Sequence, residues 1–124
     1  MKDTYLSLPS GGKITDIEST GFESYNDAYF GFRAYIKFNN GILICYGRFS
    51  KLASGDSITF LEPFSSSLYS LTISRVNATN SATTSNSAIW SVNQYYDKFD
   101  ISGDESADEH YGIWGNYIAI GTWK

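Results

Sequence analysis

Five neighbouring residues in the segment SGDESADEHY (102–111) have side chains that can bind metal ions. They are Asp104, Glu105, Asp108, Glu109 and His110, which place four carboxylates and the only histidine within seven residues. Hard cations such as Ca²⁺ bind several carboxylate oxygens, but the segment lacks the regular Asp-x-Asp-x-Asp-Gly spacing and the distal glutamate of an EF-hand loop. We therefore interpret it as a solvated acidic loop and predict neither a metal site nor a cofactor.

Nucleophilic catalysis needs a nucleophile within hydrogen-bond reach of a base, and His110 is the only histidine. The chain has no Gly-x-Ser-x-Gly motif, and the single cysteine, Cys45, falls within a predicted strand on its core side, where a thiol is usually inert. Carboxylate pairs of the kind used in glycoside hydrolysis remain possible, yet no pair stands out and the acidic residues fall mainly in polar loops. We predict that the protein is not an enzyme and keep polysaccharide hydrolysis as a lower-ranked alternative.

Aromatic residues are the most distinctive feature of the composition: ten Tyr, eight Phe and three Trp account for 17% of the chain. Aromatic rings stack on the apolar faces of sugars, and nearby Asn, Asp and Ser side chains can bond the hydroxyl groups. Six rings lie in or beside two late polar loops and form the predicted ligand-binding set: Trp90, Tyr95, Tyr96, Tyr111, Trp114 and Tyr117. For each ring the alternative is a place in the core or at a subunit interface.

Length and charge exclude several classes of protein. The 124 residues fit one domain, and the net charge of -4 has the wrong sign for a protein that binds the phosphate backbone of nucleic acids. The longest apolar run is about five residues, so we predict no membrane insertion, and the start Met1-Lys2-Asp3 lacks the apolar core of a signal peptide. One cysteine excludes an internal disulfide.

Alternation with a period of two predicts β-strands rather than helices. Phe30, Phe32, Ala34, Ile36 and Phe38 occupy alternate positions of one strand, and Asn40-Gly41 is a pair typical of a two-residue hairpin turn. With that turn, Phe38 pairs with Leu43, Ile36 with Cys45, and Tyr35 with Tyr46, in the returning strand 42–47.

This predicted hairpin is apolar on both faces. One face carries Phe38, Ile36, Leu43 and Cys45 and is the expected core, whereas the other carries Tyr35, Ile42, Ile44 and Tyr46. A sheet that is apolar on both sides has to be covered on both sides. The second cover is either another sheet of the same domain or a neighbouring subunit.

The rest of the chain shows the same pattern of short strands and turns. We expect strands at 57–60, 68–76, 88–92, 95–101 and 113–123, with long polar loops at 77–87 and 102–111; the segments 88–92 and 95–101 are either two short strands or one bent strand. Residues 1–28 are weakly patterned and are expected to form a leader that docks on the domain or on a neighbour. Residues 29–124 are predicted to form a small antiparallel β-sandwich, an all-β fold.

An ordered set of short motifs carries a resemblance to a known family. The motifs are YIKFNNGILICYG (35–47), FLEPF (60–64), YSLT (69–72), FDIS (99–102) and YIAIG (117–121). In this order they resemble the C-terminal tip domain of bacteriophage tail fibres, which also occurs in prophages and in phage-tail-like bacteriocins. The resemblance covers residues 34–123.

The resemblance implies a homotrimeric β-sandwich at the far end of a fibre, without catalytic groups, that binds glycans or proteins on the bacterial surface. It implies a location at the fibre tip of a virion or of a prophage-encoded particle, with packing about a threefold axis covering the second apolar face. The chain departs from the family where Cys45-Tyr46-Gly47 replaces a frequent Gln-Trp-Gly and where Tyr117 replaces a frequent Trp. We expect a receptor-binding tip that recognises a bacterial surface glycan; the alternative is a purely structural trimeric fibre end.

Overall fold

The computed structural model describes residues 6–7, 13–14, 16–24, 30–52, 54–75, 89–103 and 113–124, and these contain strands and turns but no helix. The strands are β1 (Leu6–Ser7), β2 (Lys13–Ile14), β3 (Ile17–Ser24), β4 (Phe30–Phe38), β5 (Ile42–Leu52), β6 (Ser57–Thr59), β7 (Ser70–Arg75), β8 (Ile89–Tyr95), β9 (Lys98–Gly103) and β10 (Ile113–Thr122). A search of this part of the chain finds no helix long and apolar enough to span a membrane.

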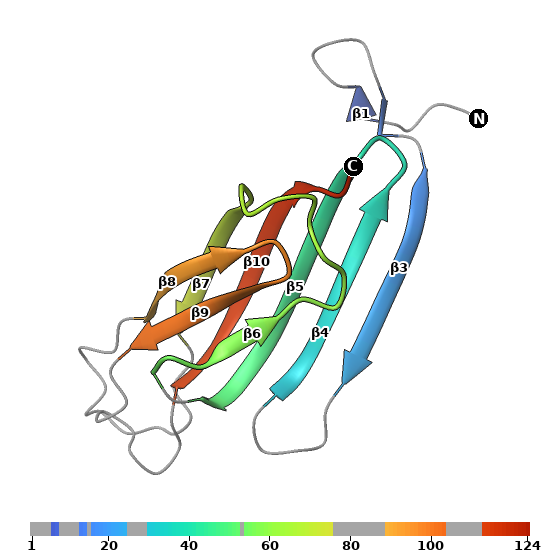
Figure 1. The fold of residues 1–124 in the computed structure, drawn as a ribbon. Helices are drawn as coiled ribbons and strands as arrows, with labels where there is room; N and C mark the ends of the chain where they lie inside the picture. The colour runs from blue at the N-terminus through green and yellow to red at the C-terminus, as the bar shows by residue number, and fades with distance from the viewer. Residues whose placement is uncertain are drawn as a thin grey trace.

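The strands form two layers, which confirms the predicted all-β antiparallel sandwich. A five-stranded sheet has the order β3-β4-β5-β10-β7 and a three-stranded sheet the order β6-β9-β8, with every neighbouring pair antiparallel. The three-stranded sheet lies over one face of the larger sheet (Figure 1). A separate two-stranded sheet joins β1 and β2.

The β4–β5 hairpin forms as predicted, but its register differs by one residue. Tyr35 pairs with Cys45 and Ile36 with Ile44, so the loop comprises three residues, 39–41, instead of two. The Gly41 amide donates to the Phe38 carbonyl over 3.0 Å, and Gly41 has a φ of 103°. A tight turn followed by a glycine in the left-handed region is the usual three-residue hairpin loop, which explains the shift.

The shift moves side chains between the two faces of the sheet, because neighbouring residues of a strand point to opposite sides. Leu43 and Cys45 lie in the core as predicted, whereas Ile36 and Phe38 lie on the opposite face. Tyr35 replaces them on the core side, where it packs against the buried cluster. Both faces of the sheet carry apolar side chains, as predicted, but the assignment of the β4 residues to them was wrong, and Arg33 and Lys37 share the core side with Tyr35.

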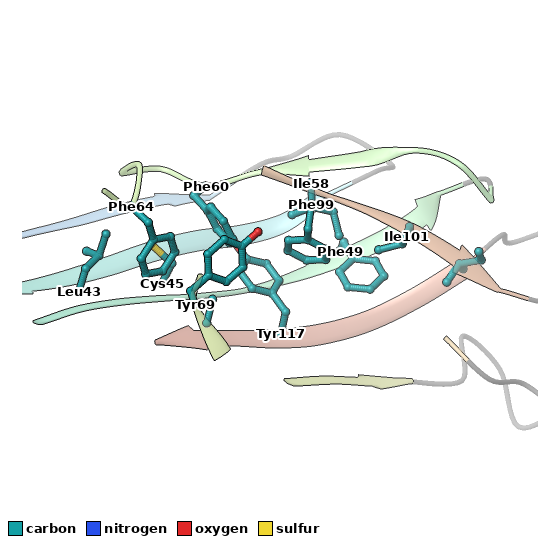
Figure 2. Close-up of a cluster of buried hydrophobic side chains, with 12 residues drawn as sticks. Leu43, Cys45, Phe49, Ile58, Phe60, Phe64, Tyr69, Phe99, Ile101 and Tyr117 are labelled. Atoms are coloured by element: carbon teal, nitrogen blue, oxygen red, sulfur yellow. The ribbon is translucent and has the colours of Figure 1, made fainter. Parts of the chain in front are cut away.

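The core fills the space between the two sheets, as Figure 2 shows. Phe60 is its central ring, with ring centroids 5.0 Å from Phe64, 5.1 Å from Tyr69 and 5.6 Å from Phe99. The buried cluster comprises Leu43, Cys45, Phe49, Ile58, Phe60, Phe64, Tyr69, Phe99, Ile101, Ile113, Tyr117 and Ala119. These side chains come from strands of both sheets and from the segment between β6 and β7, and their apolar burial joins the two sheets.

Cys45 is buried, as predicted, and its environment makes it chemically inert. The side chain is 0% exposed, and burial raises the pKa of the thiol to about 12. Because the thiolate is the reactive form, we expect iodoacetamide at about pH 8 to leave the folded protein unmodified and to label it rapidly in denaturing urea. Mass spectrometry over time measures this, and rapid labelling of the native protein would contradict the buried position.

Residues 17–24, which fall within the predicted leader, belong to the sandwich as the edge strand β3. This strand pairs along β4, with Thr20 opposite Ile36 and Phe22 opposite Ala34. Arg33 of β4 also holds Glu23 of β3 in an ion pair of 2.9 Å. Part of the predicted leader thus pairs with the domain as a strand that is stabilised by its partner and not by a strong apolar pattern of its own, and the division of the chain at residue 28 stays a prediction.

The later strands lie near the expected spans, but Tyr95, which was expected to begin the strand 95–101, ends β8, and the turn to β9 is formed by residues 96–97. Tyr69 in the core and Leu71 and Ile73 packed against it lie in and beside β7. In the three-stranded sheet, the Asp100 carboxylate accepts hydrogen bonds from Ser57 and Asn93 of the neighbouring strands, which holds its pKa below the usual range. The predicted loop 77–87 and most of the acidic loop, residues 104–111, lie outside the described residues.

Candidate ligand-binding site

A shallow, open pocket of about 440 Å³ lies where the loop after β6 meets the turn between β8 and β9. Residues 65–67 line one side, and residues 94–98 line the other. The two segments lie far apart in the sequence and are joined by the packing of the two sheets. The pocket contains two of the six predicted ligand-binding rings, Tyr95 and Tyr96.

Main-chain hydrogen bonds fix the β8–β9 turn to the core. The Phe64 amide donates to the Tyr96 carbonyl over 2.8 Å, and the Phe60 amide donates to the Asp97 carbonyl over 2.9 Å. Phe60 and Phe64 are themselves buried. The turn that carries the two exposed tyrosines is therefore anchored before any ligand arrives, which reduces the entropy lost on binding.

Tyr69 adds a third anchor beneath the pocket. Its hydroxyl donates to the Lys98 carbonyl over 3.0 Å, and its ring is buried. Burial raises the pKa of Tyr69 to about 12, so the hydroxyl keeps its proton, and hence its donor role, throughout the neutral range. This contact ties the start of β9 to the loop that precedes β7.

The two tyrosine rings differ in their exposure to solvent and in their contacts. Tyr96 is 56% exposed and Tyr95 is 42% exposed. The Lys98 ammonium lies 5.3 Å from the centroid of the Tyr95 ring, within the range of a cation–π contact. Tyr96, at the tip of the turn, is thus the more open stacking surface.

Polar groups around the rings are held in fixed orientations. The Gln94 amide nitrogen donates to the Ser67 carbonyl over 3.3 Å and to the Tyr69 carbonyl over 3.1 Å. Because these bonds use both N–H groups of the side chain, its carbonyl oxygen is left to accept a bond from a ligand. Ser66 Oγ accepts from the Leu68 amide over 3.1 Å, so its own hydroxyl proton is still available to donate.

Two of the other predicted rings, Tyr117 and Trp114, do not line this pocket. Tyr117 is 2% exposed and lies 5.3 Å from Phe99 between ring centroids, so it is a core residue and its assignment to ligand binding is corrected. Trp114 is half-buried in β10. Trp90 lies in β8, but its side chain, like the whole of Tyr111, is outside the described part of the structure.

Sequence reasoning missed the polar half of the pocket. Neither the Ser65-Ser66-Ser67 run nor Gln94 was predicted to bind a ligand. The available signal was the run of three hydroxyl residues directly after a buried aromatic, which marks a loop anchored to the core. The sequence contains no indication that this loop meets the β8–β9 turn.

The outward face of the five-stranded sheet is the second prominent surface, and we call it the outer face. Strand pairing places these residues on it: Thr20, Phe22, Ser24, Phe32, Ala34, Ile36, Phe38, Ile42, Ile44, Tyr46, Arg48, Asn116, Ile118, Ile120, Thr122, Ser70, Thr72 and Ser74. Only Arg48 among them is charged. Phe22, Ile118 and Ile120 are 67%, 51% and 48% exposed.

The described strands leave the outer face open, since the three-stranded sheet covers only the opposite side (Figure 1). Phe22 stacks on Phe32 with centroids 5.5 Å apart, and Phe32 meets Tyr46 edge-on at 6.1 Å. The rings thus form a contiguous surface and not a set of isolated apolar residues. Contiguous exposed apolar patches mark interaction surfaces in soluble proteins.

No group of His, Cys, Asp or Glu that could hold a metal ion occurs among the described residues, and the acidic loop 104–110 lies outside them. The candidate chemistry of the described surface is therefore stacking, hydrogen bonding and apolar association. Comparison with known proteins found no match to this chain among protein-family models, curated proteins or solved structures.

Proposed function

We propose that this chain is a receptor-binding tip module of the phage tail-fibre type, which assembles as a homotrimer and binds a bacterial surface glycan through the pocket at 65–67 and 94–98. It acts without catalysis, at the fibre tip of a virion or of a prophage-encoded particle. The observation that carries the proposal is the pair of exposed rings, Tyr95 and Tyr96, on a turn fixed to the core beside oriented polar groups.

The pocket matches the two-sided chemistry of a sugar. The C–H face of a pyranose is apolar and stacks on an aromatic ring, while its hydroxyl groups need donors and acceptors. Tyr96 supplies the ring, Gln94 a fixed acceptor and Ser66 a hydroxyl donor. A shallow site of this kind binds a chain of sugars along its surface and does not enclose a small molecule.

The outer face supports self-association. Each chain carries a net charge of -4, so two copies repel each other over most of their surface. The outer face has one charged residue, Arg48, and can meet a second copy with little repulsion while its apolar side chains leave water. We therefore assign further copies of this chain as the occupants of the face.

Three copies would compensate for weak single sites. One shallow pocket binds a sugar weakly, whereas linked sites on a rigid tip gain about 10²- to 10⁴-fold when their spacing matches the receptor. Surface polysaccharides repeat the same unit many times and so present several sites to one particle. Assembly and glycan binding are in this way two parts of one function.

The Tyr96→Ala variant tests glycan binding. We expect it to bind bacterial cells and isolated envelope glycans at least about tenfold less well than the unmodified protein, because the main stacking surface is lost. Flow cytometry with labelled protein and a bacterial glycan array measure this. Tyr96→Phe is the matched control: it retains the ring and should keep most of the binding.

The purely structural alternative is favoured by the outer face, which serves assembly without any ligand. If the unmodified protein assembles but binds neither cells nor glycans, the module only terminates a fibre. If it binds and Tyr96→Ala binds equally well, the receptor site lies elsewhere on the surface and the assigned pocket is wrong.

A further inference from the structure

We infer that the pocket selects uncharged saccharides and rejects acidic ones. This inference rests on the proposed function, because it concerns the ligand of the same pocket. It goes further in naming the class of polymer: neutral hexose or N-acetylhexosamine chains, as opposed to polymers with uronate, sialate or phosphate groups. The charges that line the pocket and the contacts that already engage them carry the argument.

The pocket has no net positive charge to offer an acidic sugar. Among its described lining residues only Asp97 and Lys98 are charged, and they have opposite signs. The Lys98 ammonium is already engaged over the Tyr95 ring at 5.3 Å. Carboxylate and phosphate groups are usually bound by arginine in a two-pronged contact, and no arginine lines this pocket.

Asp97 makes the pocket unfavourable for anions. It follows Tyr96 in the turn and lines the same pocket, and its main-chain carbonyl accepts a hydrogen bond from the Phe60 amide, so the main chain that carries the carboxylate is held at the pocket. An acidic sugar stacked on Tyr96 would bring a second negative charge close to Asp97. The net charge of -4 on the whole chain adds repulsion at longer range.

A neutral sugar finds complementary partners in the same place. Its hydroxyl or amide N–H groups can donate to the Gln94 carbonyl oxygen and to the Asp97 carboxylate, and its ring oxygens can accept from Ser66. Asp97 is then an acceptor in a hydrogen bond rather than a source of repulsion. Asp97 thus favours the binding of neutral sugars and disfavours the binding of acidic ones.

The test compares each acidic polysaccharide with its own neutral form. Acidic bacterial polysaccharides are arrayed beside their carboxyl-reduced derivatives, which keep the same backbone, together with naturally neutral polysaccharides, and are probed with the full chain. We expect neutral and reduced members to bind at least about tenfold better than acidic ones. Binding to the neutral members should change less than about twofold between 0.05 and 0.5 M NaCl, since no ion pair is formed.

Asp97→Asn tests the residue that enforces the selection. Asparagine keeps the main-chain bond of the turn, so this variant should bind neutral members within about twofold of the unmodified protein and acidic members about three- to tenfold better. Glu18→Gln removes the same charge from an exposed position on the edge strand β3, which does not line the pocket, and should change neither.

The outcomes separate the inference from the proposed function. Equal or stronger binding to the acidic member of a pair, or no change in Asp97→Asn, overturns the charge selection while leaving a glycan-binding pocket in place. Absence of binding to every member, with Tyr96→Ala indistinguishable from the unmodified protein, overturns the proposed function itself.

Discussion

Ile118→Lys is expected to convert the assembled protein into a monomer. Ile118 is 51% exposed on β10, where it lies on the outer face between Tyr46 of the central strand β5 and Thr72 of the edge strand β7. A lysine here would place an unpaired charge inside each subunit contact, which costs several kcal/mol per buried ion. Because the residue is exposed in a single chain, the fold itself should be retained.

Native mass spectrometry and sedimentation equilibrium at micromolar concentration measure the effect. The unmodified protein should contain three chains and Ile118→Lys one, with unchanged circular dichroism. Leu68→Lys is the matched control, because Leu68 is 89% exposed but lies outside the outer face, and it should remain assembled. A monomeric unmodified protein, or an assembled Ile118→Lys, would show that the outer face does not join copies of the chain.

We also expect that loss of assembly in Ile118→Lys strongly weakens binding to cells. Ile118→Lys keeps the pocket at 65–67 and 94–98 intact, so its binding to an isolated oligosaccharide should be unchanged. Its binding to whole cells should fall by the avidity factor, about 10²- to 10⁴-fold. The two measurements together distinguish damage to the site from loss of multivalency.

Phe99→Ala is expected to lower the free energy of unfolding by about 3–5 kcal/mol. Phe99 is 0% exposed in β9, and its ring lies between Phe60 and Tyr117 at centroid distances of 5.6 and 5.3 Å. Removing the ring leaves a cavity at the contact between the two sheets. Domains of this size have a free energy of unfolding of about 5–15 kcal/mol, so this single substitution removes a large part of the stability.

Urea denaturation, followed by tryptophan fluorescence at one fixed protein concentration, measures the change. The concentration is fixed because assembly contributes to apparent stability. Leu68→Ala removes an exposed side chain and should alter the free energy of unfolding by less than about 0.5 kcal/mol. A loss below about 1 kcal/mol in Phe99→Ala would contradict the central position of this ring in the core.

The β4–β5 hairpin shows which structural features the sequence alone could predict and which it could not. Alternation predicted both strands and the turn, because strand periodicity and the Asn-Gly pair are local properties. The Asn-Gly pair fits both a two-residue loop and a three-residue loop with glycine last, so this pair did not decide the register. The register rests on the Gly41 amide bond to Phe38 and on the pairing of β5 with β10, which fixes Cys45 opposite Ala119.

The candidate site likewise contains residues that the sequence predicted correctly and one that it did not. Tyr95 and Tyr96 could be selected from the sequence because they are aromatic residues near the late polar loops, but Tyr117 satisfied the same criterion and lies in the core. Alternation alone does not decide which of two apolar faces is covered. Only the packing of the three-stranded sheet decides it, and that packing depends on contacts between distant segments.

The sequence by itself determined the all-β class, the approximate positions of most strands, the buried thiol of Cys45 and the apolar character of both faces of one sheet, since each follows from residue type and a period of two. Tertiary structure alone decided the hairpin register, the inclusion of β3 in the sheet and the meeting of Ser66 with Tyr96 in one pocket. These features depend on contacts between segments that lie far apart in the sequence. The free energy of such a contact depends on both segments together, so neither segment alone predicts it.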